Sequence, residues 1–179
     1  MTFAQAVGRC FRRYATFSGR ARRAEYWWFV LFVLLGSLVT GMLDAALFGT
    51  AVIEPDGEIG DTGDGPLAIG FGLATFVPGI AAGWRRMHDT GRSGLYLVYP
   101  LIVMIGIATF LGVLAGFGPL LAGDFEGVFA GGSAIVMAVA LIVLFISPLL
   151  VLWWLIQPGD AGPNRYGPDP RSEERKSRA

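Results

Sequence analysis

The residues best suited to chemistry lie in a short polar stretch, 84–94, which reads WRRMHDTGRSG. It holds the only histidine of the chain, His88, directly before Asp89. A histidine paired with a carboxylate can act as a general base, so these two residues are the candidates for catalysis. Adjacency in sequence does not bring two side chains into contact, and the hydroxyls of Thr90 and Ser93 belong to no recognisable nucleophile motif. We therefore expect His88 to make a structural hydrogen bond, to a loop carbonyl or to Asp89.

Metal chemistry is not expected. The chain has one histidine and one cysteine, Cys10. A zinc site takes three or four ligands of the His, Cys or carboxylate type. We expect no metal and no cofactor, and a lone cysteine cannot form a disulfide within the chain.

Arginine is the other residue type that could bind a ligand here. Its planar guanidinium presents donors that match a phosphate or a carboxylate two at a time. At a membrane surface the commonest anion is a lipid headgroup, and each basic residue near an anionic leaflet contributes about 1 kcal/mol. The candidates for an anion-binding or lipid-binding site are Arg20, Arg22, Arg23, Arg85, Arg86, Arg92, Ser93, Asn164 and Arg165.

The same arginines could instead form a structural network, and we favour this interpretation. In it they make internal ion pairs, such as Arg22 or Arg23 with Glu25, or Arg86 with Asp89. Such a network would tie the middle polar segment to the two ends of the chain. Its expected further members are Glu25, Tyr26, Trp27, His88, Asp89 and Tyr166.

The elements that must position these residues are four apolar stretches, at 26–48, 67–83, 95–118 and 134–157. The chain is 54% hydrophobic and only 16% charged, whereas soluble domains are about 25% charged. A helix needs about 20 apolar residues to cross a hydrocarbon core of about 30 Å. We expect an all-α membrane protein with four transmembrane helices, built as a single domain over residues 1–170 and followed by a charged, disordered tail at 171–179.

The orientation follows from the basic residues. All fourteen Lys and Arg residues lie in segments 1–25, 84–94 and 158–179, and the two other polar segments carry only acidic charges. Basic residues in short loops stay on the cytoplasmic side. Both termini and the middle loop are therefore expected to be cytoplasmic.

Residues 3–15 have a helical period, with apolar side chains at Phe3, Val7, Cys10, Phe11 and Tyr14 and arginines on the other side. A helix with a basic polar face and an aromatic apolar face is typical of the membrane interface. We expect an amphipathic interfacial helix here. The alternative is a short helix that packs on the rest of the protein.

Three motifs carry a resemblance to a known family. FSGRARRAEYW at 17–27, RRMHDTGRSG at 85–94 and NRYGPDP at 164–170 resemble, in order and spacing, the DUF805 family of small bacterial inner-membrane proteins. Met87 and the pair Leu95-Tyr96 depart from the usual family pattern, at positions that look like packing or interface anchors. The resemblance implies about four spans and supplies no activity.

Three functions follow as hypotheses. The first is a structural or interaction protein of the bacterial inner membrane, whose cytoplasmic arginine motifs form a cap that docks anionic phospholipid headgroups or a partner. The second is a small oligomeric transporter or channel, motivated by proline-bearing spans and by Asp44, although we expect that carboxylate to be hydrated near the end of its span. The third is an enzyme acting on lipid headgroups through His88 and Asp89. The expected partners are the bilayer, a second copy of the chain or another membrane protein, and no nucleic acid.

Overall fold

The computed structural model describes residues 1–49, 65–115, 118, 121–124 and 134–172. Within these ranges the regular elements are helices, in the order α1 (Phe3–Arg12), α2 (Arg23–Phe48), α3 (Pro66–Asp89), the 3-10 helix η1 (Gly94–Val98), α4 (Tyr99–Ala115) and α7 (Ala134–Ile156). Four segments are long and apolar enough to cross a membrane: Arg23–Phe48, Pro66–Asp89, Gly94–Val113 and Ala138–Ile156. The prediction of an all-helical protein with four such segments is confirmed.

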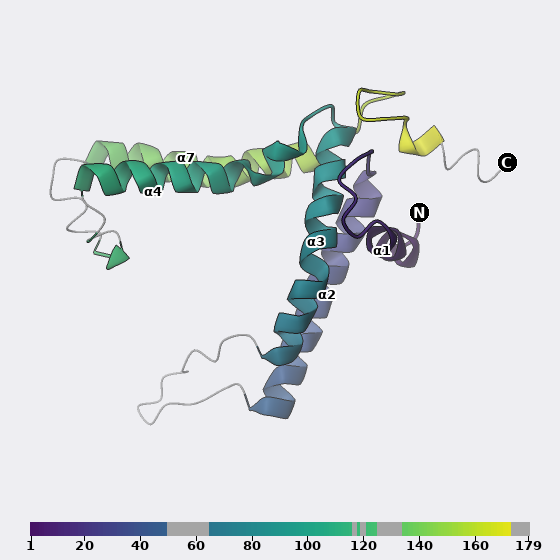
Figure 1. The fold of residues 1–179 in the computed structure, drawn as a ribbon, viewed down its shortest axis with the longest axis horizontal. Coiled ribbons are helices and arrows are strands. Elements are labelled where there is room, and N and C mark those ends of the chain that lie inside the picture. Colours follow the sequence, from purple (N-terminus) through teal and green to yellow (C-terminus); the bar gives the residue numbers. More distant parts are fainter. Residues whose placement is uncertain (50–64, 116–117, 119–120, 125–133, 173–179) are drawn as a thin grey trace.

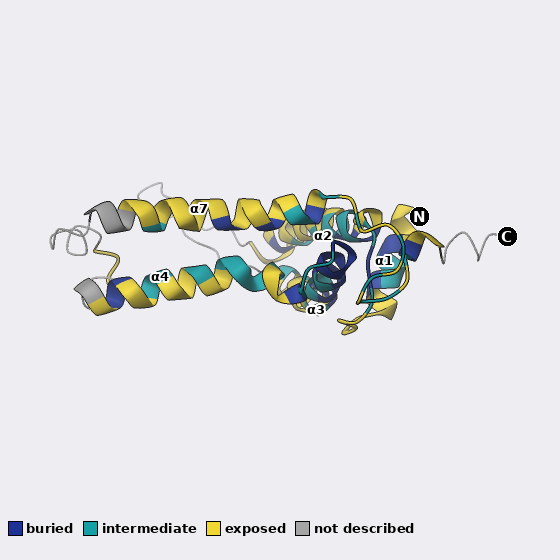
Figure 2. Cartoon of the chain, turned by 90° about the horizontal axis from the view of Figure 1, so that it is seen from above, coloured by how far each residue is buried: buried dark blue, intermediate teal, exposed yellow. Residues whose placement is uncertain are grey.

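The long helices form two pairs. α2 lies beside α3 and α4 lies beside α7, and the two pairs extend in different directions from one corner (Figure 1). At this corner α2 begins, α3 and α7 end, and η1 leads into α4. α1 and the segment after α7 lie at the same corner. Figure 2 shows that the buried residues concentrate there, whereas α4 and α7 expose most of their length.

The exposed surface of the spans is apolar. Side chains such as Leu34, Leu73 and Phe145 are 63%, 70% and 71% exposed. A helix in lipid satisfies its backbone polar groups internally and presents apolar side chains on every side. α2 and α3 approach closely through glycine, because a Cβ at Gly36 would lie 2.1 Å from the ring of Phe71.

Asp44 caps the start of α3. Its carboxylate accepts hydrogen bonds from the backbone N–H groups of Leu67 (3.1 Å) and Ala68 (2.8 Å), and the residue is only 1% exposed. The first N–H groups of a helix have no partner within it, and an aspartate is a preferred acceptor for them. The expectation of a hydrated carboxylate is therefore wrong, and the residue that motivated a transport function stabilises a helix end.

The stretch 84–94 is not the loop that the sequence predicts. α3 continues through Trp84 to Asp89, and the chain turns at Gly91, whose φ is +71°. The polar residues of this last helical turn are buried with partners from distant segments, which the local hydropathy cannot register. Ser93 then caps η1 by accepting a hydrogen bond from the N–H of Leu95 (3.4 Å).

α1 begins at a capping box formed by Thr2 and Gln5. It packs on α2 through aromatic edges: the ring centroids of Phe3 and Trp28 are 5.8 Å apart, and those of Phe11 and Phe29 are 5.7 Å apart. The apolar side of α1 thus contacts the protein. Most of the acidic segment between the first two predicted spans (residues 50–64) and most of the predicted tail (residues 173–179) lie outside the described residues, and the single domain over 1–170 stays a prediction.

Candidate functional site

Three segments that are far apart in sequence meet at the corner. Backbone hydrogen bonds join them: the N–H of Ala21 donates to Arg85 O (3.0 Å), and the N–H of Asp160 donates to Asp89 O (2.7 Å). The Asn164 amide donates to His88 O (3.0 Å). The N-terminal motif and the C-terminal motif therefore both contact the last turn of α3. We call the buried side chains of Arg20, Arg85, Arg86, Glu25 and Asp89 the arginine network.

Arg20 links the N-terminal motif to the C-terminal segment. Its Nε donates to Asp89 Oδ1 (2.9 Å), while its two terminal nitrogens donate to the carbonyls of Gly162 and Asp160 (2.6 Å each). The side chain is 1% exposed. With hydrogen bonds from all three guanidinium nitrogens, Arg20 fixes the position of the chain after α7.

Arg86 links α3 to the end of α7. Its Nη1 donates to Asp89 Oδ2 (2.7 Å), its Nε to Leu155 O (3.1 Å) and its Nη2 to Gln157 O. The last carbonyls of a helix have no partner within it, and the helix dipole makes that end negative. A buried guanidinium at this place therefore satisfies the end of α7. The predicted pair of Arg86 with Asp89 is confirmed.

Arg85 points to the other side of α3, toward α1 and α2. Its Nη1 donates to Glu25 Oε1 (2.6 Å) and its Nε to Ala81 O (3.2 Å). The second oxygen of Glu25 lies 3.7 Å from Arg9 Nη1. The structure thus pairs Glu25 with Arg85 and Arg9 and not with Arg22 or Arg23, because the side chain of Glu25 points into the interface with α3.

Cys10 is buried beside this ion pair. Burial of the thiol, and then the negative charge of Glu25, raise the pKa of Cys10 to about 11. The thiolate is the reactive form of cysteine. Cys10 therefore behaves as a small apolar side chain in the contact between α1 and α3, with Phe29 and Ala82 in the same cluster.

His88 and Asp89 take different partners. His88 Nδ1 lies 3.0 Å from Gly19 O, a contact that requires a proton on Nδ1. The imidazole stacks on the ring of Tyr166, with centroids 3.8 Å apart and planes 3° apart. The Asp89 carboxylate instead binds Arg20 and Arg86. The expected structural hydrogen bond of His88 to a loop carbonyl is confirmed, and this geometry gives the two residues no joint acid–base role.

The C-terminal motif forms a tight turn over the end of α3. Asn164 and Gly167 exchange two backbone hydrogen bonds of 3.0 Å, and Asn164 Oδ1 accepts from the N–H of Tyr166 (2.9 Å). Arg165 donates to Gly91 O (3.0 Å), and its guanidinium lies 4.7 Å from the centroid of the Tyr166 ring. Just beyond the turn, the N–H of Arg171 lowers the pKa of the Asp169 carboxyl.

The remaining predicted site residues surround the network. Arg92 lies over the ring of Trp154 at 5.2 Å and donates to Thr90 O. Arg22 is the N-cap residue of α2, and its side chain makes no capping hydrogen bond. Tyr26 and Trp27 make an edge-to-face contact and pack against Met87, Val151 and Leu155. Among the described residues, Arg92, Tyr26 and Trp27 make no hydrogen bond to a side chain of the arginine network.

The sequence reasoning missed the residues between α7 and the C-terminal motif. A Cβ at Gly159 would lie 2.0 Å from Asp89 Oδ2, so only glycine allows this approach. Asp160 and Gly162 contribute backbone carbonyls to Arg20. Backbone acceptors leave no signature in residue type, although the Gly-Asp-Ala-Gly run at 159–162 could have indicated a close approach.

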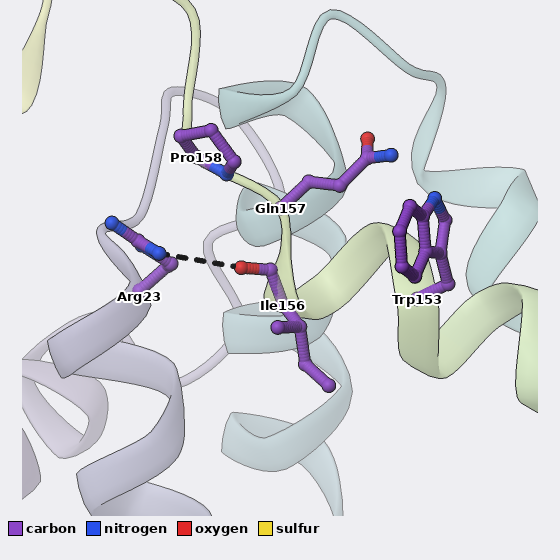
Figure 3. Close-up of a pocket in the computed structure, with 5 residues that line it drawn as sticks. All are labelled: Arg23, Trp153, Ile156, Gln157 and Pro158. Atoms are coloured by element: carbon purple, nitrogen blue, oxygen red, sulfur yellow. Dashed lines mark hydrogen bonds between the residues drawn. The ribbon is translucent and has the colours of Figure 1, made fainter.

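A pocket opens beside the network, between the start of α2 and the end of α7. Its volume is about 550 Å³, and it is lined by Arg23, Trp153, Ile156, Gln157 and Pro158 (Figure 3). The Arg23 guanidinium lies at one side and donates a long hydrogen bond to Ile156 O (3.5 Å). Among the described residues, no group of three or more His, Cys, Asp or Glu side chains is placed to hold a metal ion.

Comparison with known proteins gives a consistent result. The family described as "Protein of unknown function (DUF805)" matches residues 14–168. Inner membrane protein YhaH of Escherichia coli K12 is 29% identical over 162 residues, which cover 90% of this chain and 93% of that protein. Inner membrane protein YhaI of the same strain is 34% identical over 95 residues, which cover 53% of this chain and 70% of that protein. No solved structure matches the chain.

Proposed function

The chain belongs to the DUF805 family, and we propose that it is a multi-pass protein of the bacterial inner membrane with a structural or interaction role. In this role the arginine network holds the two helix pairs together at one membrane face. The arginines that remain at the surface of the corner dock anionic lipid headgroups. The supporting observation is that the buried and the exposed arginines of the three motifs have different partners.

The buried arginines already have internal partners. Arg20 and Arg86 share Asp89 and also bind backbone carbonyls, and Arg85 binds Glu25. The donors of Arg20 and Arg86 are used in this way, while Nη2 of Arg85 makes no hydrogen bond within the described residues but is fully buried and out of reach of a headgroup. We therefore assign these side chains to the structural role.

The arginines nearer the surface, of which Arg23 and Arg165 are exposed and Arg92 is half-buried, have weaker internal partners. Arg23 makes a hydrogen bond of 3.5 Å, and Arg92 and Arg165 each donate to one loop carbonyl, at 3.2 and 3.0 Å. An anionic leaflet attracts basic residues of this kind by about 1 kcal/mol each. We assign lipid docking to Arg23, Arg92 and Arg165.

The proposal also includes an orientation. We place both termini and the corner at the cytoplasmic face, because all fourteen Lys and Arg residues belong to the polar segments of that side. α1 would then lie at the headgroup level. Its exposed Arg12 and Arg13 would point toward water, on the side opposite its aromatic residues, which would rest on α2 and the adjoining acyl chains.

The test compares two triple variants that lose the same charge. The first is Arg23→Gln/Arg92→Gln/Arg165→Gln, and the control is Arg12→Gln/Arg13→Gln/Arg171→Gln, whose side chains are exposed. Each protein is purified from membranes in mild detergent, and the retained lipids are counted by native mass spectrometry. We expect the first variant to lose retained anionic lipid and the control to keep it. Equal retention in all proteins, or an equal loss in both variants, contradicts a docking surface at the corner.

A further inference from the structure

The pocket between α2 and α7 has the position of a headgroup site. Arg23 is the first residue of α2, and Trp153 and Ile156 belong to the last turn of α7. Gln157 and Pro158 line the pocket where the chain leaves the helix, and the pocket is open to the surface (Figure 3). Its volume of about 550 Å³ lies within the range of about 300–1,000 Å³ that is usual for small-ligand sites.

Arg23 differs from the network arginines in its freedom to bind a ligand. Its hydrogen bond to Ile156 O, at 3.5 Å, is the one it makes within the described residues, and the residue is exposed. Arg20, by contrast, is buried and donates at 2.6 to 2.9 Å to three acceptors. The guanidinium of Arg23 can therefore turn toward a phosphate and donate two parallel hydrogen bonds to it.

The other walls of the pocket suit the part of a lipid next to its phosphate. Trp153 and Ile156 are 62% and 50% exposed, and they offer apolar surface against a glycerol backbone and the first acyl carbons. Tryptophan is enriched at this depth of a membrane because its ring is apolar while its indole N–H stays near water. The side-chain amide of Gln157 adds a donor, and none of the five lining residues is acidic.

Two helix ends border the pocket, the N-terminus of α2 and the C-terminus of α7. The N-terminus of α2, which carries a partial positive charge, has no side-chain cap. The C-terminal carbonyls of α7 would repel an anion, but Arg86 already binds those of Leu155 and Gln157. The carbonyl of Ile156 is the one that faces Arg23, at 3.5 Å, and a phosphate in the pocket would replace this long hydrogen bond.

We propose that this pocket binds the phosphodiester headgroup of an anionic glycerophospholipid. Arg23 grips the phosphate, and Trp153 and Ile156 contact the glycerol and the acyl carbons beside it. The inference rests on the proposed function, since it requires the corner to lie at headgroup depth. It goes further in naming one pocket and one ligand class.

The experiment titrates the full-length protein in mild detergent with phosphatidylglycerol or phosphatidylcholine and follows one-to-one adducts by native mass spectrometry. We expect preferential binding of phosphatidylglycerol, weakened about fivefold or more in Arg23→Gln, as the loss of one basic contact predicts. The matched control Arg13→Gln should bind as the wild type does. The affinity of Arg23→Lys should fall between those of the wild type and Arg23→Gln, because lysine keeps the charge but cannot donate two parallel hydrogen bonds to a phosphate. The unfolding temperatures should agree among all four proteins, which excludes a folding defect.

Three outcomes would overturn the inference. Unchanged phosphatidylglycerol binding in Arg23→Gln excludes the pocket. An equal loss in Arg13→Gln means that binding follows total charge. Displacement of the lipid by millimolar inorganic phosphate means that the site recognises free phosphate and not a lipid. If Arg92→Gln/Arg165→Gln loses anionic lipid while Arg23→Gln does not, the inference fails and the proposed function stands.

Discussion

Replacing Asp89 with asparagine tests the arginine network most directly. The Asp89 carboxylate lies between two buried guanidiniums, 2.9 Å from Arg20 Nε and 2.7 Å from Arg86 Nη1, and the residue is 4% exposed. Asparagine keeps the shape of the side chain but removes the charge. It also places an NH₂ group where one of the two guanidiniums donates, so that two donors face each other.

The expected cost can be estimated from the partners that remain. Removing one member of a buried ion pair costs about 3–5 kcal/mol, because the other charge is left buried without compensation. Arg20 keeps the carbonyls of Asp160 and Gly162, and Arg86 keeps that of Leu155. We therefore expect the lower end of the range, about 3 kcal/mol. Against a typical total of about 5–15 kcal/mol for a folded domain, such a loss is readily measured.

The assay is unfolding of the purified protein in mixed micelles with increasing sodium dodecyl sulfate, followed by tryptophan fluorescence. The matched control is Asp160→Asn, since Asp160 is an exposed carboxylate that accepts a hydrogen bond from the Asn164 amide (3.0 Å). The control should cost about 0.5 kcal/mol, as is usual for surface substitutions. An Asp89→Asn protein as stable as the wild type, or no less stable than Asp160→Asn, would refute the network as a source of stability.

Two further predictions concern single side chains. Cys10 should not react with maleimide in the folded protein at pH 8, because its pKa is raised to about 11, and it should react once the protein is unfolded in detergent. Mass spectrometry of the labelled protein measures the reaction. Fast labelling of the folded protein would contradict the prediction. Since the folded pKa exceeds the usual thiol value, the contribution of Cys10 to stability is present in full below about pH 8.5 and is lost as the pH rises through about 11. Asp44→Ala should lower the free energy of unfolding by about 1–2 kcal/mol, because it removes the cap of α3, with Asp44→Asn falling in between; a protein of unchanged stability in the same assay contradicts the capping role.

The spans could be predicted from the sequence, but one of their ends could not. Apolar length is a local property, and the predicted stretch 26–48 agrees with α2 at Arg23–Phe48 to within three residues. The stretch 67–83 stops six residues short of the end of α3 at Asp89. The missing turn is polar in composition, and it stays helical because its side chains are satisfied from other segments. Hydropathy carries no information about those distant partners.

The ion pairs show the same division between local and distant information. Arg86 and Asp89 are three residues apart on one helix, a spacing at which side chains meet, and the predicted pair is present at 2.7 Å. The partner of Glu25 is Arg85, which is sixty residues away. The sequence analysis predicted Arg22 or Arg23 as the ion-pair partner of Glu25 because they are closer in sequence. All three candidates are arginines, so residue type does not distinguish them from Arg85.

The balance of buried charge explains why the C-terminal motif packs against the ends of α3 and α7. Among the described residues, three arginines, Arg20, Arg85 and Arg86, are buried beside two buried carboxylates, Glu25 and Asp89. The third positive charge has no acidic partner in this set. It is compensated by backbone carbonyls, from the end of α7 for Arg86 and from the segment after α7 for Arg20.

This compensation couples the segment after α7 to the spans. If that segment left the corner, Arg20 would keep only its bond to Asp89, and a buried guanidinium without enough acceptors is costly. The segment is thus held in place by the charges that it satisfies. A side chain buried and held in this way is out of reach of a ligand, so the buried arginines stabilise the corner and any anion from outside must bind at the arginines near the surface. Among Arg23, Arg92 and Arg165, Arg23 has the longest internal hydrogen bond (3.5 Å), and it lines a pocket beside the network.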